Sequence, residues 1–180
     1  MTKNVTELTI INTNARSLCP KIESLVECMC EIEAGVAVVT ETWMREGEGL
    51  EDIRRALVLG EGMGMLCKNR EPCQMNGVAY GGVALVWKER IGAFREVQLQ
   101  NEEKHEVLVA VGTLRGQSRR LAIVACYVPP NIEKRRADKC QEYIAEAVLH
   151  IKELPGSVHS RYGRFQPVAC GGLPCQLHGY

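Results

Sequence analysis

The chain opens with a pattern of apolar and polar residues that predicts a strand, a helix and a second strand. Residues 8–12 (Leu-Thr-Ile-Ile-Asn) are β-branched and apolar, and the polar residues after them indicate a buried strand that ends in a turn. Pro20 suits the first turn of a helix, Gly35 is expected to stop that helix, and residues 36–39 are typical of a second buried strand. The helix itself is predicted from five apolar residues at helical spacing: Ile22, Leu25, Val26, Met29 and Ile32.

A strand, a helix and a strand within about 30 residues predict a βαβ unit with parallel strands and a right-handed crossover. The carboxyl ends of parallel strands lie at the same edge of a sheet. Asn12 and Glu41 are therefore expected at one edge, each at the end of its strand.

Further along, beyond a glycine-rich and weakly patterned stretch over residues 47–64, strand-like runs recur at intervals of roughly ten residues. Turn residues such as Gly92 separate these runs, so we predict a meander of antiparallel strands. The runs span residues 81–87, 94–99, 107–111 and 121–128. Pro129 and Pro130 end the last run, and a closing helix follows. Its apolar face is formed by Cys140, Ile144, Ala147, Val148 and Ile151. The predicted fold class is α/β, with a mixed sheet and helices outside it.

Composition narrows the class of protein. With 180 residues, 46% of them hydrophobic and 24% charged, the chain fits one globular domain and excludes collagen, coiled coils and low-complexity proteins. No apolar run approaches the ~20 residues of a membrane span, so we expect a soluble chain that is not secreted. The 22 basic residues balance the 22 acidic ones, so any nucleic-acid role must depend on a local site. The nine cysteines lack zinc-finger spacing and are expected to be reduced thiols.

The last part of the chain differs from the rest. Residues 154–180 contain three Pro and five Gly, and they contain no Asp, Glu or Lys. This composition predicts a disordered tail behind a domain that spans residues 5–153.

Four short motifs, taken in order, resemble the endonuclease/exonuclease/phosphatase superfamily, and most closely the apurinic-endonuclease-like domain of non-LTR retrotransposons. They are residues 10–18 (Ile-Ile-Asn-Thr-Asn-Ala-Arg-Ser-Leu), 38–43 (Val-Val-Thr-Glu-Thr-Trp), 81–85 (Gly-Gly-Val-Ala-Leu) and 125–130 (Ala-Cys-Tyr-Val-Pro-Pro). Each motif alone is weak, and their order and spacing carry the likeness. The resemblance implies a four-layered α/β sandwich, here incomplete at its carboxyl end, that cuts phosphodiesters with Mg²⁺ and binds the DNA backbone.

The resemblance also implies roles for three residues. Glu41 would be the carboxylate that binds Mg²⁺, which prefers a few hard oxygen ligands. Asn12 would orient the phosphate or a water on the metal, and the Tyr127 hydroxyl would meet the scissile phosphate. The plain alternatives are a solvated acid for Glu41, a turn former for Asn12 and a core side chain for Tyr127. Residues 134–136 (Lys-Arg-Arg) could touch a phosphate backbone or form an ordinary solvated face.

Two catalytic motifs of the superfamily are missing from these 180 residues. A Gly-Asp-Phe-Asn motif would position the attacking water and hold the phosphate, and an Asp-His pair would stabilise the transition state. Synonymous codons for residues 163–168, followed by the first base of the Ala169 codon, permit Gly-Asp-Phe-Asn-Gln-Trp when they are read one base later. We therefore hypothesise a single-base frame change near Glu153 or Leu154, which the encoding DNA would test.

The missing motifs leave several functions open. The first is a retrotransposon endonuclease domain that nicks DNA and is catalytically impaired here. The second is a non-catalytic remnant or binding module of the same fold, and the third is a phosphatase relative. Action in the nucleus would follow from the role of the family, yet no basic import cluster supports it, so nuclear and cytoplasmic locations both stay open.

Overall fold

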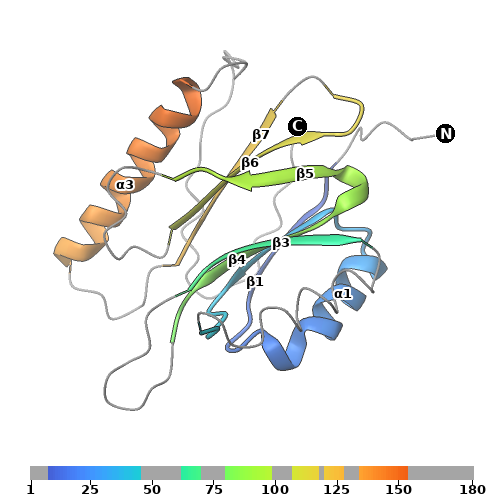
Figure 1. Ribbon diagram of the computed structural model, residues 1–180. Helices are drawn as coiled ribbons and strands as arrows, with labels where there is room; N and C mark the ends of the chain where they lie inside the picture. Colours follow the sequence, from blue (N-terminus) through green and yellow to red (C-terminus); the bar gives the residue numbers. More distant parts are fainter. Residues whose placement is uncertain are drawn as a thin grey trace.

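The computed structural model describes residues 8–45, 62–69, 80–98, 107–117, 120–127 and 134–153. These residues form two β-sheets and two long helices (Figure 1). The strands of the first sheet are β1 (Ile10–Asn14), β2 (Val36–Thr40), β3 (Met63–Lys68) and β4 (Val83–Lys88). The strands of the second sheet are β5 (Gly92–Glu96), β6 (Val107–Leu114) and β7 (Arg120–Cys126). The helices are α1 (Ile22–Glu31) and α3 (Lys134–Glu153), with 3-10 turns at Cys19–Lys21 and Glu89–Ile91.

The first sheet has the strand order β1-β2-β4-β3. Strands β1 and β2 are parallel, with Ile10 opposite Val36 and Asn14 opposite Thr40, which confirms the βαβ unit. Strand β4 runs antiparallel to both β2 and β3. The expectation that residues 81–87 belong to the meander is therefore wrong. All six residues of β4 are buried, and a strand that is apolar on both faces belongs in the interior of a sheet.

The second sheet is the predicted antiparallel meander, in the order β5-β6-β7. Its first strand begins at Gly92, a residue that the sequence predicts in a turn. At this position φ is +153°, and an added Cβ would lie 2.3 Å from the carbonyl oxygen of Thr113. Glycine thus allows β5 and β6 to approach each other closely where their pairing starts.

Two local boundaries in the βαβ unit differ from the predicted ones. Strand β1 continues to Asn14, so Asn12 is its central residue rather than its end, because the parallel pairing with β2 continues through the polar residues. Helix α1 ends at Glu31, and Glu33 rather than Gly35 adopts a positive φ of 55° after it. Gly35 instead provides space, since an added Cβ would lie 2.7 Å from Leu8 Cδ1.

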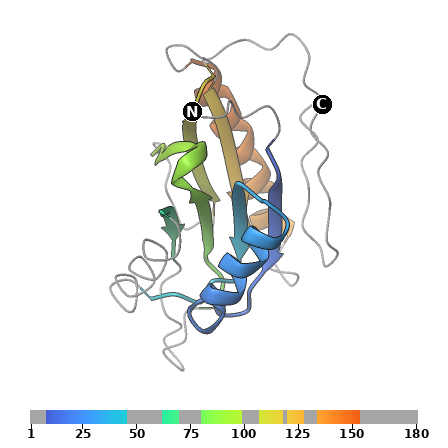
Figure 2. The same cartoon turned by 90° about the vertical axis from the view of Figure 1, so that its right-hand side faces the viewer.

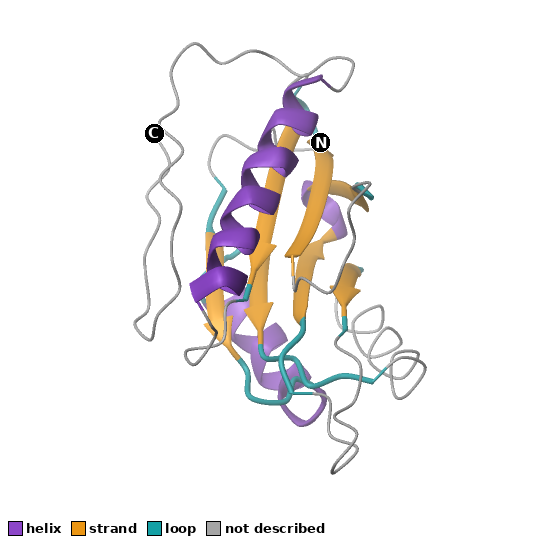
Figure 3. Cartoon of the chain, turned by 90° about the vertical axis from the view of Figure 1, so that its left-hand side faces the viewer, coloured by secondary structure: helices purple, strands orange, loops and turns teal. Residues whose placement is uncertain are grey.

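The two helices form the outer layers of the molecule. Helix α1 buries Leu25 and Met29 against the alternate residues of β2 that face it, Ala37 and Val39. Figure 2 shows α1 lying along one side of the strands. On the other side, α3 lies over the second sheet (Figure 3) and buries Tyr143 and Ala147 there. The predicted apolar face of this helix is confirmed at Ile144, Ala147 and Ile151.

A third apolar cluster fills the space between the sheets. It draws on both sheets and includes Val36, Leu85, Trp87, Phe94 and Leu108. The layer order is thus helix, sheet, sheet, helix, which confirms the four-layered α/β sandwich. Strand β3 is not predicted from the sequence, because Gly64 interrupts its short apolar run and the stretch before it is rich in glycine. The predicted tail, residues 154–180, lies outside the described residues.

No helix in the described ranges is long and apolar enough to cross a membrane.

Candidate functional site

Two residues that follow strand ends meet at one edge of the sandwich. Glu41 comes directly after β2 in the first sheet, and Tyr127 comes directly after β7 in the second. The Tyr127 hydroxyl donates a hydrogen bond of 2.5 Å to Glu41 Oε1, and the pair is partly buried. This contact connects the two sheets across the edge where β2 and β7 both end.

The backbone holds Glu41 in an uncommon conformation. Its φ is +52°, in the left-handed region that residues other than glycine rarely adopt. Neighbouring segments hold this backbone on both sides. The Ser17 N–H donates to the Glu41 carbonyl oxygen at 3.0 Å, and the Trp43 N–H donates to the Gly81 carbonyl oxygen at 2.9 Å. Backbone strain that its surroundings maintain is typical of functional sites.

Gly82 allows the start of β4 to lie against the residue that follows Glu41. An added Cβ at Gly82 would lie 2.4 Å from Thr42 Oγ1, and the φ of Gly82 is +83°. The Thr42 side chain is completely buried, and within the described part of the chain its hydroxyl has no hydrogen-bond partner. The Gly81-Gly82 motif therefore has a physical role, because it provides the space in which residues 41–43 pass.

Tyr127 combines two of the roles that its sequence allowed. Along β7, Ile123 and Ala125 face the core between the sheets, and the Tyr127 ring packs against the same core. The ring is therefore a core side chain, whereas its hydroxyl reaches the carboxylate at the edge. The short apolar run before Tyr127 places the ring on this face by simple alternation.

Asn12 shares this inner face of the first sheet but lies further from the edge. It is paired with Val38, and both Ile10 and Val38 pack against the core between the sheets. Residues at i and i+2 of a strand share a face, so the half-buried Asn12 side chain also faces the second sheet. Strand β2 ends at Thr40, two residues after Val38, and Glu41 is the next residue. The structure thus joins Glu41 to Tyr127 and places Asn12 deeper on the same face.

The donor atoms suit a hard cation. The described ranges contain no group of three or more His, Cys, Asp or Glu side chains that could hold a metal. Mg²⁺ does not need such a group, because it is usually held by one or two carboxylates together with waters and substrate phosphates. The Glu41 carboxylate and the Asn12 amide supply oxygen donors of this kind, so their chemistry fits Mg²⁺. The side chains of residues 134–136 lie outside the described residues.

An aromatic pair at the same edge was not recognised from the sequence. The rings of Trp43 and Tyr80 have centroids 5.1 Å apart and an interplanar angle of 83°. Trp43 belongs to one of the four motifs, but nothing in the sequence around Tyr80 indicated that the two would meet. The backbone hydrogen bonds of Thr42 with Gly82 and of Trp43 with Gly81 bring them together.

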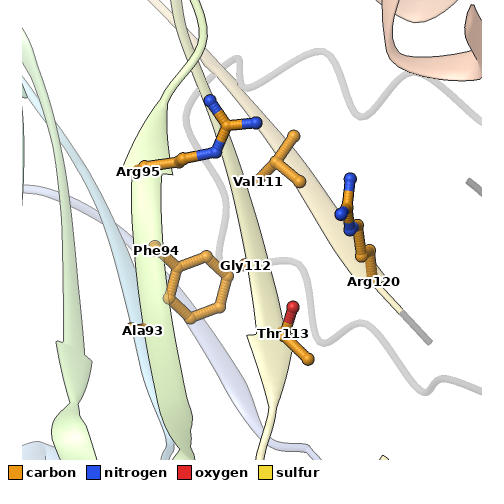
Figure 4. A pocket seen from close by; sticks show the side chains of 7 residues that line it. All are labelled: Ala93, Phe94, Arg95, Val111, Gly112, Thr113 and Arg120. Carbon is orange, nitrogen blue, oxygen red and sulfur yellow. The ribbon is translucent and has the colours of Figure 1, made fainter. Parts of the chain in front are cut away.

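A hollow of about 200 Å³ lies on the second sheet, away from this edge. Figure 4 shows the side chains of Arg95 and Arg120 beside it, on β5 and β7. Arg120 begins β7 whereas Tyr127 follows its end, so the hollow is at the opposite end of the sheet. Neither Asn12, Glu41 nor Tyr127 lines it.

No protein-family model and no curated protein sequence matches the chain. Several solved structures do match. The 3′ phosphatase NExo from Neisseria, bound to a product DNA hairpin, is 14% identical at a TM-score of 0.56, covering 81% of this chain and 52% of its own. An AP endonuclease from Archaeoglobus fulgidus is 12% identical at a TM-score of 0.51. The match covers 82% of this chain and 52% of that protein. An endonuclease/exonuclease/phosphatase family protein from Leptotrichia buccalis is 15% identical at a TM-score of 0.51. The match covers 77% of this chain and 61% of that protein.

These likenesses confirm the resemblance at the level of the fold. The chain has the α/β fold of endonuclease/exonuclease/phosphatase structures, and it spans about half the length of those it matches.

Proposed function

We propose that this chain carries a Mg²⁺-dependent endonuclease domain of a non-LTR retrotransposon, which nicks DNA and is catalytically impaired here. The observation that carries the proposal is the hydrogen bond from Tyr127 to Glu41. Two residues that the family motifs single out independently, one in each sheet, come into direct contact at a strand-end edge. The motif Asn-Thr-Asn-Ala-Arg-Ser-Leu over residues 12–18 favours the retrotransposon branch.

Each of the three residues has a defined chemical role in this proposal. Glu41 and Asn12 would hold Mg²⁺, which supplies a positive charge that stabilises the reacting phosphate. The Asn12 amide can also donate a hydrogen bond to a phosphate oxygen, since its NH₂ group has two donors. Tyr127 orients the Glu41 carboxylate in the free protein.

The Tyr127 hydroxyl has a single hydrogen to donate. A phosphate oxygen at the edge would therefore compete with Glu41 Oε1 for that hydrogen. Donation to the phosphate would release one carboxylate oxygen of Glu41 for other partners, so DNA binding and the availability of Glu41 are coupled through one proton donor.

The proposed impairment follows from what these residues cannot do. Neither Glu41, Asn12 nor Tyr127 is placed as a general base for the attacking water. The residues that serve this purpose in the family belong to the Gly-Asp-Phe-Asn and Asp-His motifs, which are missing from these 180 residues. General base and transition-state contributions are each worth about a hundredfold or more in rate, so their loss should leave little activity.

The decisive experiment is nicking of supercoiled plasmid DNA in Mg²⁺, with Glu41→Ala compared with the exposed Glu89→Ala as a matched control. We expect no nicking above that of the Glu41→Ala variant. Robust nicking that Glu41→Ala abolishes and Glu89→Ala does not would overturn the impairment while supporting the endonuclease assignment.

A binding measurement tests the metal site separately. Mn²⁺ can replace Mg²⁺ as a paramagnetic probe, and we expect Glu41→Gln to weaken its binding while Glu89→Gln leaves it unchanged. Equal binding by both variants would contradict the role of Glu41.

A second candidate function is a non-catalytic binding module of the same fold. It is favoured by the same missing motifs, because a preserved fold without its catalytic residues can still bind DNA. The two candidates differ in metal binding, since an impaired endonuclease binds Mn²⁺ through Glu41, whereas a binding module retains DNA with no metal bound at Glu41.

A further inference from the structure

We propose that Trp43 and Tyr80 form a stacking site for an unpaired base of single-stranded nucleic acid. The proposal deepens the proposed function. It rests on that function in one respect, because it assumes that the phosphate backbone of the nucleic acid passes Glu41. It assigns a ligand class to an aromatic pair that has no role in holding the metal or the phosphate.

The pair is built into the edge that carries Glu41. Trp43 follows Glu41 by two residues, and its N–H donates to the Gly81 carbonyl oxygen at 2.9 Å. This backbone contact brings Tyr80, the neighbour of Gly81, beside the indole. The rings meet edge to face, with centroids 5.1 Å apart and an interplanar angle of 83°.

The exposure of Tyr80 is unusual for an aromatic residue. It is 45% exposed, and only Ile32 and Leu149 among the described large apolar residues are comparably open to solvent. Those two lie just after α1 and on α3, away from the edge. The Tyr80 ring, which contacts the partly buried Trp43, is therefore an accessible aromatic surface beside the site proposed for phosphate.

The geometry of the pair suits a planar ligand. In an edge-to-face contact, the edge of one ring covers a face of the other, so the first ring keeps its own faces clear of its partner. A nucleobase stacks on such a face whatever its sequence, because every base has a π-face.

Positive charge at the same edge favours nucleic acid over an apolar peptide as the ligand. Arg16 is exposed in the turn whose Ser17 N–H donates to Glu41, and the Lys21 ammonium donates to the carbonyl oxygens of Ala15 and Arg16 in that turn. Arg45 follows Trp43 by two residues. The whole chain has zero formal net charge, so these cations mark a local site suited to a phosphate backbone.

The test compares two ligands that differ only in their bases. The first is a fluorescently labelled oligothymidylate, and the second is an abasic oligomer of equal length with the same phosphates. Binding of the full chain is measured by anisotropy in EDTA, so neither metal binding nor hydrolysis contributes. We expect the thymidylate to bind about tenfold more tightly, which corresponds to the stacking of one base.

Variants of Tyr80 test the stacking site directly. Because the Tyr80 side chain is exposed, its replacement should leave the fold intact. We expect Tyr80→Leu to bring thymidylate binding down to the abasic level and Tyr80→Phe to retain it, because Phe keeps the ring. Trp43→Leu should have the same effect as Tyr80→Leu. Leu149→Ala, which changes an even more exposed apolar residue on α3, serves as the matched control and should leave binding unchanged.

The failure of this proposal can be distinguished from failure of the proposed function. Equal binding of the two ligands, no binding of either at low salt, or an unchanged affinity in Tyr80→Leu would each overturn the stacking site. Base-dependent binding that disappears in Tyr80→Leu supports it, even if Glu41→Gln has no effect on metal binding.

Discussion

Glu41 and Tyr127 are 86 positions apart in the chain, yet a single hydrogen bond of 2.5 Å joins the carboxylate of one to the hydroxyl of the other. Each residue directly follows a strand, β2 in the first sheet and β7 in the second. The bond therefore depends on how the two sheets are stacked. Substitutions at these two residues should affect both the stability of the fold and the proposed chemistry.

This relationship predicts a measurable coupling between the two residues. Tyr127→Phe and Glu41→Gln each weaken the bond, so their combined effect on the free energy of unfolding should be smaller than the sum of the single effects. We expect a coupling of about 1–2 kcal/mol, because a hydrogen bond to a charged group is worth about 1.5–3 kcal/mol and Glu41→Gln keeps a weaker, uncharged acceptor. Urea unfolding of the four chains measures it, and strictly additive effects would contradict the contact.

The second prediction concerns Gly82. Replacing it with alanine should destabilise the fold for two reasons, a close contact of the added Cβ and a positive φ. Gly82→Ala places a Cβ 2.4 Å from Thr42 Oγ1 at a φ of +83°, whereas the control Gly62→Ala has a φ of +64° and no atom nearer than 3.4 Å. We expect Gly62→Ala to cost about 1 kcal/mol from its φ alone and Gly82→Ala about 1–2 kcal/mol more.

Thermal or urea unfolding distinguishes these two variants. The fluorescence of Trp43 should change in Gly82→Ala, because the shifted Thr42 is its neighbour. Equal stability losses in both variants would show that the close approach of β4 to residues 41–43 is absent in solution.

A buried lysine predicts a third effect. Lys88 is 2% exposed, and its ammonium donates a hydrogen bond of 3.1 Å to the Met29 carbonyl oxygen. Met29 lies in the last turn of α1, whose terminal carbonyls lack helical partners and attract positive charge. The lysine thus caps the carboxyl end of α1 from β4.

Two substitutions separate the packing of the Lys88 stem from its charge. Lys88→Ala removes both, and we expect it to cost about 2–4 kcal/mol. Lys88→Met keeps most of the volume and avoids burying a charge, so it should cost about 1 kcal/mol or less. Urea unfolding compares them, and a Met variant as unstable as the Ala variant would mean that the ammonium rather than the stem stabilises this site.

The domain boundary predicted from composition gives a fourth prediction. Removing residues 154–180 should change the free energy of unfolding by less than about 0.5 kcal/mol, as for changes outside a packed core. Ending the chain at Pro130 instead removes α3, which buries Tyr143 and Ala147, and the cooperative transition should then be lost. A large stability loss in the first truncation would place the tail inside the folded unit.

Part of the candidate site could be predicted from local signals. Glu41 and Tyr127 follow apolar runs that end where the strands end, and both were identified by the motifs around them. The position of Asn12 was predicted less well, because the polar residues after it suggested a turn although they continue β1 in parallel pairing. The meeting of Trp43 with Tyr80 had no local signal, since it depends on a backbone bond between distant segments.

Apolar periodicity alone determined that this chain builds a βαβ unit, an antiparallel meander and a closing helix, because alternation and helical spacing report which side of each element avoids water. It could not determine the partners of each strand. Residues 83–87 are apolar on both faces and could fill any interior position, and only the packing of two sheets assigned them to the place between β2 and β3. The same packing brought the Tyr127 hydroxyl to Glu41, because contacts between sheets depend on how whole faces stack and leave no trace in the local pattern.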